Sequence, residues 1–230
     1  MQWRDLPNDF AMSWQLAYYY FQLWSKQGTL LDIMCSLRQL FRKKKGRKRK
    51  GQQAPQRNKK YKTGTIGMID SQATNNSCVA RNKGFCHYKL TNGIKKHVLV
   101  DSNGLCICSI CTPANISDEE GMKLLIIKHR ELLKKLDLEK ILADLGYKSK
   151  DFAQFLLNKL NLIINLAPRN SETKEKTKGF KVQPMRWKSE RQFAWCDGFR
   201  RLWKNCEKCL ETTENWIYLA NIRILAKRLG

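Results

Sequence analysis

Short apolar runs separated by turn residues lie in the middle of the chain and predict strands. Residues 65–70 read as a buried strand that ends in an acid, and residues 97–101 read as a second strand. The pair Asn103-Gly104 precedes a third apolar run at 105–110, and Asn-Gly between two such runs is typical of a hairpin turn. These patterns predict three strands, the last two joined by a tight hairpin.

The next stretch combines helical and strand patterns. Ser117 followed three residues later by a glutamate forms a capping box, which predicts a helix that begins there and extends to about Leu136. Residues 139–144 are a fourth expected strand, which again ends in an acid. A helix over 150–160 and an apolar run at 162–166 complete a strand-helix-strand unit. This alternation predicts an α/β domain.

The two ends of the chain have different patterns. Residues 3–41 are rich in aromatic side chains and show apolar positions at helical spacing, so at least one amphipathic helix is expected. Residues 42–62 include twelve Lys or Arg and no acid, which predicts a linker or exposed arm. Residues 168–184 read as a polar loop. The basic stretch 186–229 predicts two helices that are broken near Thr212-Thr213.

Composition narrows the function classes. With 230 residues and 42% hydrophobic residues, the chain can form one substantial core. A formal net charge of +24 favours a polyanionic partner, either nucleic acid or an anionic membrane surface. The opening residues lack the pattern of a signal peptide and no run approaches 18 apolar residues, so cytoplasmic residence without membrane insertion is expected. The nine cysteines are then expected to be reduced thiols.

Two strand-end acids, Asp70 and Asp144, are candidate metal ligands. Hard divalent cations prefer oxygen ligands, and phosphodiester cleavage by two metal ions needs converging carboxylates. If the two strands are neighbours, these acids meet at one edge of the sheet, and Glu190 would approach from a helix. A turn-forming role for Asp70 fits the spacing as well, and a turn role is the better interpretation of Asp101, which precedes the hairpin.

Several of these segments resemble insertion-sequence DDE transposases of the insertion-sequence-five group. Six collinear blocks along nearly the whole chain carry the resemblance: QWRDLPNDF with WQLAYYYFQLW, MIDSQATNNS, KKHVLVDSNGL, ILADLGYKS, GFKVQPMRWKSERQFAWCDGFRRLWKNCE and NWIYLANIRILAKRL. The second, fourth and fifth blocks match those that carry the family's catalytic acids, here Asp70, Asp144 and Glu190.

The resemblance implies a ribonuclease-H-like fold, a mixed five-stranded sheet with flanking helices. It divides the chain into a partial N-terminal helical segment at 1–41, a basic linker at 42–62 and a catalytic domain at 63–230. It also implies Mg²⁺, with Mn²⁺ as a substitute, bound for DNA cutting and joining. The expected partner is double-stranded DNA with terminal inverted repeats, bound by a homodimer in a bacterial cytoplasm, at the nucleoid.

Basic residues at two places are candidate contacts for DNA phosphate, since guanidinium groups pair well with phosphate oxygens. Arg186 matches the arginine of a signature in related transposases, whereas its tyrosine and lysine would fall at Gln183 and Asp197 and are absent. Solvated surface positions are an alternative for each. The candidates are Lys43, Lys44, Lys45, Arg47, Lys48, Arg49, Arg186, Arg191, Arg200 and Arg201.

Family members carry a further helical segment before QWRDLP, so the resemblance predicts that the N-terminal segment of this chain is truncated. A DNA-binding regulator without cutting activity is therefore a second hypothesis, and a basic protein of membrane surfaces is a third. Zinc held by Cys106, Cys108 and Cys111 with the pair Cys206/Cys209 is a weaker interpretation, since the first two lie on one face of a strand and the pair falls on an expected helix. The histidines, His87, His97 and His129, lack paired ligand spacing.

Overall fold

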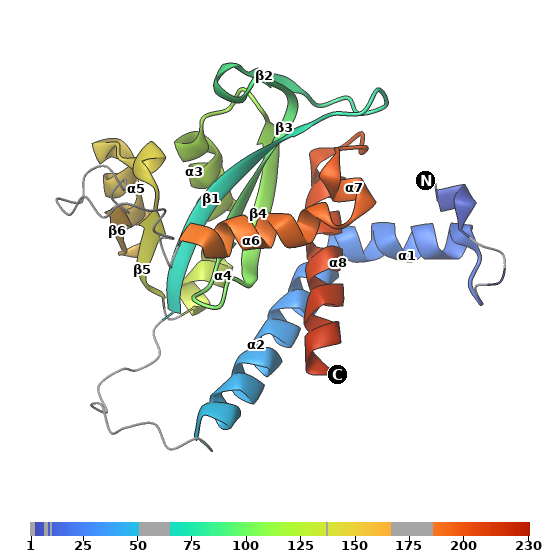
Figure 1. The fold of residues 1–230 in the computed structure, drawn as a ribbon, viewed down its shortest axis with the longest axis horizontal. Coiled ribbons are helices and arrows are strands. Elements are labelled where there is room, and N and C mark those ends of the chain that lie inside the picture. The colour runs from blue at the N-terminus through green and yellow to red at the C-terminus, as the bar shows by residue number, and fades with distance from the viewer. Residues whose placement is uncertain (1–2, 7–8, 10, 51–64, 137, 167–185) are drawn as a thin grey trace, which may run out of the picture.

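A mixed sheet forms the centre of the protein in the computed structural model, which describes residues 3–6, 9, 11–50, 65–136, 138–166 and 186–230 (Figure 1). Its five main strands run in the order β4-β3-β1-β5-β6, where neighbours pair directly. The pairings among β4, β3 and β1 are antiparallel, and those of β1 with β5 and of β5 with β6 are parallel. The strand bounds are β1 Thr65–Asn75, β3 Thr91–Val100, β4 Cys106–Pro113, β5 Leu138–Ala143 and β6 Ile163–Leu166. The expected mixed five-stranded sheet with flanking helices is confirmed.

A short additional strand, β2 (Gly84–Cys86), pairs with the start of β3 and makes a sixth strand. The central position of β3 follows from register, because Leu99 pairs with Ile69 of β1 on one side and with Cys108 of β4 on the other. The expected hairpin at 102–104 joins β3 to β4, and Gly104 has φ of +73° there, a conformation that suits glycine.

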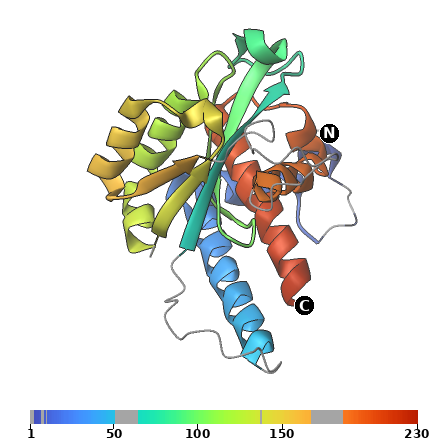
Figure 2. The same cartoon turned by 60° about the vertical axis from the view of Figure 1, so that its left-hand side comes forward.

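Helices cover both faces of the sheet (Figures 1 and 2). On one face lie α3 (Asp118–Lys128), α4 (Arg130–Lys135) and α5 (Lys150–Leu160), and their apolar side chains pack on Ile69 of β1, Leu99 of β3, and Ile107, Cys108 and Ile110 of β4. On the other face lie α6 (Arg186–Asp197) and α8 (Leu210–Leu229). Since side chains alternate along a strand, even-numbered residues of β1 and β3 face α6 and α8.

The chain before β1 adds two helices to the second face. α1 (Trp14–Gln27) begins at Ser13, whose hydroxyl accepts from the Leu16 amide, and ends at Gly28. α2 (Thr29–Lys50) packs with α8 and β4 around a second core made of Phe21, Leu30, Met34, Leu105, Cys106, Tyr218 and Leu225. α2 continues past residue 41, so residues 42–50 are helical rather than an unstructured arm. Residues 51–62 of the expected linker lie outside the described residues.

Two helix predictions were wrong in detail. The helix expected from 118 to 136 is interrupted at His129, which caps α3 and precedes α4. The stretch 186–229 contains three helices, because α7 (Arg200–Trp203) lies between α6 and α8. The expected break near Thr212-Thr213 does not occur, because α8 continues through both residues. The Thr213 hydroxyl donates a hydrogen bond to the side chain of the buried Asn205. The expected loop at 168–184 lies outside the described residues.

The residues that the structure describes also contain three short 3-10 turns: η1 Trp3–Asp5, η2 His87–Lys89 and η3 Leu145–Tyr147. Within the described part of the chain, no helix combines the length and the apolar character that a bilayer crossing requires.

Candidate active site

Asp70 lies in β1, and Asp144 directly follows β5, the neighbouring strand that runs parallel to β1. Met68 of β1 pairs with Leu142 of β5, and each aspartate follows its paired residue by two positions. Met68 and Leu142 belong to one apolar cluster with Phe193 of α6, and alternation along β1 turns the Asp70 carboxylate toward α6. Both acids therefore lie just beyond the end of the parallel pairing between β1 and β5. The expectation that the two strands are neighbours is confirmed.

Asp70 does not end its strand, in contrast to the sequence-based prediction. β1 continues to Asn75 in antiparallel pairing with β3, although its parallel pairing with β5 stops at Met68. Asp70 therefore sits at the point where β1 separates from β5.

Hydrogen bonds fix the orientation of both aspartates. Asp70 Oδ1 accepts from the Ser71 amide at 2.8 Å, and Asp70 Oδ2 accepts from the Ser189 hydroxyl at 2.9 Å. Asp144 Oδ1 accepts from the Gly146 amide at 2.9 Å, and Asp144 caps η3.

The pKa of Tyr147 is affected by the negative charges of this region. Burial raises its phenol pKa well above the ordinary value, and the charges of Asp118, Asp70 and Asp144 raise it further. Asp118 contacts the sheet from the opposite face, where it accepts from Lys95 Nζ at 2.8 Å and from the Ser71 hydroxyl at 2.7 Å. Burial by itself would raise the Asp118 pKa, but these bonds and the charge of Lys95 outweigh it and lower that pKa.

Glu190 lies on α6, next to Ser189, with its side chain exposed. In the described ranges, no three His, Cys, Asp or Glu residues are placed to share one metal ion. The carboxylates of Asp70 and Asp144 fit an oxygen-preferring divalent ion in chemistry and register. Asp70 and Asp144 thus each follow a pair of β1–β5 partners by two residues, and Glu190 lies on α6, the helix that contacts Asp70.

Contacts with the hairpin at 101–105 hold α6 in place. Lys188 Nζ donates to the Ser102 carbonyl and Arg191 donates to the Asn103 carbonyl, both at 2.7 Å. The Arg191 guanidinium also lies 4.3 Å and 4.5 Å from the ring centroids of Trp187 and Trp195. Sequence reasoning missed Ser189, whose only local signal is its position beside Glu190.

Asp101 has the turn role that its position predicted, and a second role besides. Its Oδ1 accepts from the amides of Asn103 and Leu105, which closes the hairpin. Its Oδ2 lies 3.6 Å from Arg38 and 3.6 Å from Arg42, both on α2. Asp101 is fully buried and Arg38 is 1% exposed. The hairpin therefore links α2 to α6.

The candidate DNA-contacting residues on α2 lie along one end of that helix. Lys43 is exposed, Lys44 Nζ donates to the Leu229 carbonyl, and Lys45 Nζ donates to Asn103 Oδ1 at 2.9 Å. The backbone of Arg47, Lys48 and Arg49 is helical, and their side chains lie outside the described part.

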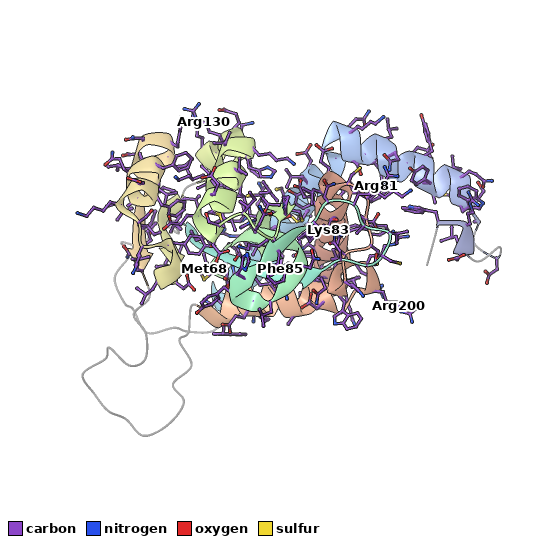
Figure 3. All side chains as sticks on the ribbon, turned by 90° about the horizontal axis from the view of Figure 1, so that it is seen from above. Met68, Arg81, Lys83, Phe85, Arg130 and Arg200 are labelled. Atoms are coloured by element: carbon purple, nitrogen blue, oxygen red, sulfur yellow. The ribbon has the colours of Figure 1, made fainter. Side chains whose placement is uncertain are left out.

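The remaining candidates differ in their surroundings. Arg186 opens α6 and its side chain is not described, and Arg200 is exposed at the edge of the molecule (Figure 3). Arg201 pairs with Glu207 and lies 4.8 Å from the Trp216 ring centroid. Arg191 and Arg201 therefore have intramolecular partners that would compete with phosphate.

The cysteines do not form the zinc site considered above. Cys106, Cys108 and Cys111 are buried on β4, and burial raises the pKa of each thiol. Cys206 and Cys209 lie in the connection before α8, so their expected helical placement was wrong.

Two of the three histidines are buried: His97 lies in β3, and His129 lies between α3 and α4. His97 contacts the Thr112 hydroxyl at 3.0 Å and His129 contacts the Ser109 carbonyl at 3.3 Å. Burial lowers both pKa values to about 4. His87 instead packs edge-on against Phe85. All three are accounted for by packing or hydrogen bonds.

Comparison with known proteins adds a family match. Residues 61–225 match the family described as "Transposase DDE domain". No curated protein matches the chain. A solved structure, the cryo-EM structure of a piggyBac transposase synaptic complex with hairpin DNA, aligns with 14% identity and a TM-score of 0.43. That alignment covers 72% of this chain and 48% of the piggyBac chain, so this chain spans about half of it.

Proposed function

The chain belongs to the transposase DDE domain family, and from that premise we propose that it is a DNA transposase that cuts and joins DNA at insertion-sequence ends. The observation that carries the proposal is that Asp70 and Asp144 each lie two residues beyond Met68 and Leu142, which pair across two parallel strands. Paired carboxylates at such an edge suit phosphodiester chemistry, in which an oxygen nucleophile attacks phosphorus and a DNA oxygen leaves.

Asp70 and Asp144 would hold Mg²⁺, or Mn²⁺ in its place, with Glu190 as the third ligand. The bound metal supplies activation of the attacking oxygen and charge stabilisation of the leaving oxygen. The hydroxyl of Ser189 orients Asp70 by donating to Oδ2. Glu190 follows Ser189 directly on α6, so the proposed third ligand is carried by the helix that contacts Asp70.

Double-stranded DNA with terminal inverted repeats is the proposed substrate, bound by a homodimer in the bacterial cytoplasm at the nucleoid. The net charge of +24 supports a polyanionic partner. The basic end of α2 is the proposed phosphate-binding element. Replacing Lys43, Arg47 and Lys48 by glutamine should weaken binding for all DNA sequences and lower the salt slope by about one per lost phosphate contact. An unchanged slope, measured by fluorescence anisotropy, would exclude α2 from phosphate binding.

A second candidate function is a DNA-binding regulator that does not cut. It is favoured by one observation, namely that no three potential metal ligands come together among the described residues. In that case the basic surfaces would bind element DNA without cutting it.

Metal-dependent nicking separates the two candidates. Purified protein is incubated with supercoiled DNA that carries the element ends, with Mg²⁺ or Mn²⁺. We expect nicking or strand joining by the wild type, loss of it in Asp70→Asn and Asp144→Ala, and retention in Asp151→Asn, a matched change at an exposed position of α5. DNA affinity should be similar in all four proteins. Binding without any nicking by the wild type would support the regulator instead.

A further inference from the structure

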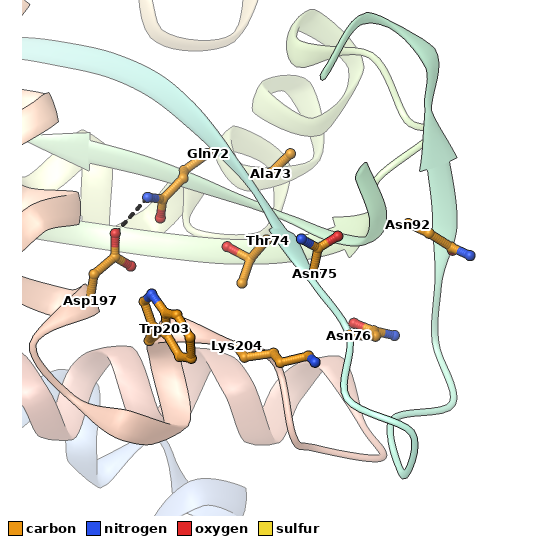
Figure 4. A pocket seen from close by; sticks show the side chains of 9 residues that line it. All are labelled: Gln72, Ala73, Thr74, Asn75, Asn76, Asn92, Asp197, Trp203 and Lys204. Carbon is orange, nitrogen blue, oxygen red and sulfur yellow. Dashed lines mark hydrogen bonds between the residues drawn. The ribbon is translucent and has the colours of Figure 1, made fainter. Parts of the chain in front are cut away.

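A pocket of about 650 Å³ opens beside β1, just beyond Asp70 (Figure 4). Gln72 and Thr74 follow Asp70 on the same face of the strand, so the pocket and the candidate active site share one wall. Gln72 is about 7 Å from Asp70 along β1, at roughly 3.4 Å per residue. The lining residues are Gln72, Ala73, Thr74, Asn75, Asn76, Asn92, Asp197, Trp203 and Lys204.

One wall of the pocket is held by a buried lysine. Lys96, 1% exposed, places its Nζ 3.3 Å from Asp197 Oδ1 and donates to the Leu202 carbonyl at 2.7 Å. Asp197 Oδ2 accepts from Gln72 Nε2 at 2.8 Å (Figure 4). The charge of Asp197 is therefore balanced, and the end of α6 is fixed against β1.

The opposite wall is held by Asn205, which is 2% exposed. Its amide donates to the Asn75 carbonyl at 2.9 Å and its carbonyl accepts from the Ser77 amide at 2.8 Å, in a bridge to the end of β1. Its side-chain amide donates to Asn76 Oδ1 at 2.8 Å. Because Trp203 and Lys204 directly precede Asn205, this bridge sets their position at the mouth of the pocket.

The lining combines a flat aromatic ring with amide groups. Trp203 is 71% exposed although its neighbours in the chain are anchored. Beside it lie the side-chain amides of Gln72, Asn75 and Asn76, which can both donate and accept hydrogen bonds. Gln72 Oε1 is buried and has no hydrogen-bond partner among the described residues. Lys204 adds a positive charge. A matching ligand is flat, polar at its edge and attached to an anion.

We propose that this pocket takes one unpaired nucleobase of the DNA strand that passes Asp70, with the base stacked on Trp203. The inference rests on the proposed function, which places a DNA strand at Asp70. The volume lies within the range of about 300–1,000 Å³ that is usual for small ligands and excludes a duplex. A base within a duplex is covered by its neighbours on both faces and offers only its edges, so only an unpaired base can present a face to the indole.

The test compares binding of two single strands of equal length, one of thymidine nucleotides and one of abasic nucleotides, without metal and at fixed salt. We expect the wild type to bind the thymidine strand about tenfold more tightly or better, since stacking on one aromatic side chain has roughly that effect. Trp203→Ala should bind both strands nearly equally, Trp203→Phe should keep part of the preference, and Trp24→Ala, which removes a partly exposed tryptophan of α1, should behave as the wild type.

Each outcome decides the proposal separately from the proposed function. If Trp203→Ala keeps the full preference for bases, or if it weakens duplex binding as much as single-strand binding while its circular dichroism is unchanged, the pocket does not bind a base. Nicking assays with the wild type remain an independent measure. A preference for bases without nicking would support the base-binding pocket and refute the transposase activity. Nicking without a preference for bases would support the transposase activity and refute the base-binding pocket.

Discussion

Removing the charge of Asp101 should destabilise the protein strongly. Asp101→Asn keeps an oxygen that can accept from the amides of Asn103 and Leu105, so the turn can form. It leaves the guanidinium of Arg38 buried, at 1% exposed, without its anionic partner. Uncompensated burial of one member of such a pair costs about 3–5 kcal/mol in the free energy of unfolding. For a protein of this size the melting temperature should fall by roughly 6–20 °C.

A double-mutant cycle in urea tests the physical reason. Arg38→Met removes the buried charge that Asp101→Asn leaves without its anionic partner. The loss in the free energy of unfolding of the double variant Arg38→Met/Asp101→Asn should therefore be smaller than the sum of the losses in the two single variants, by at least about 1 kcal/mol. As a control, Lys134→Gln and Glu131→Gln disrupt an exposed ion pair on α4 and should each change stability by no more than about 0.5 kcal/mol. If the effects of Arg38→Met and Asp101→Asn simply add, the ion pair is not what holds α2 to the hairpin.

Three further results are expected. Burial lowers the pKa of His97 and His129 from 6.5 to about 4, so between these pH values both histidines are protonated in the unfolded chain and neutral in the folded protein. The free energy of unfolding should therefore fall as the pH drops from about 6.5 to 4, by up to about 1.4 kcal/mol per pH unit for each histidine, and His129→Gln should flatten the dependence measured in urea. Gly121→Ala would place Cβ 2.1 Å from the His97 ring and should cost at least about 1–3 kcal/mol, whereas Gly198→Ala, whose Cβ meets its nearest atom at 3.4 Å, should be nearly neutral in the same titration. Ser189→Ala should slow single-turnover nicking about tenfold without weakening DNA binding, and an unaltered rate would show that this hydroxyl does not orient the active site.

The strand predictions succeeded where apolar residues were contiguous and failed where they were not. The run before Asp70 was recognised, but the predicted strand ended at Asp70, and the rest of β1 has the polar sequence SQATN. It forms a strand because β3 supplies a pairing partner as far as Asn75. Long-range pairing of this kind leaves no local pattern.

The site could be predicted in part for the same reason. Asp70 and Asp144 carry a local signature, an acid at or after an apolar strand, and the family match agrees with the resemblance of their blocks. The hydrogen bond from Ser189 to Asp70 depends on how α6 docks, 119 residues further along the chain. Buried lysines are also unexpected from sequence, because a lysine in a strand reads as exposed unless its partner is known. Lys96 is buried because Asp197 lies beside it.

The second core has a consequence for how the protein is made. Phe21, Leu30 and Met34 emerge early from the ribosome, yet they pack against Tyr218 and Leu225 of α8. At about 5–20 residues per second, the apolar side of α2 waits roughly ten to forty seconds for its partner. During that interval the apolar face of α2 is exposed, and a chaperone or a second nascent chain on the same mRNA can bind to it. Slowing or speeding translation between β1 and α8 should therefore alter the yield of soluble protein while leaving the finished fold unchanged.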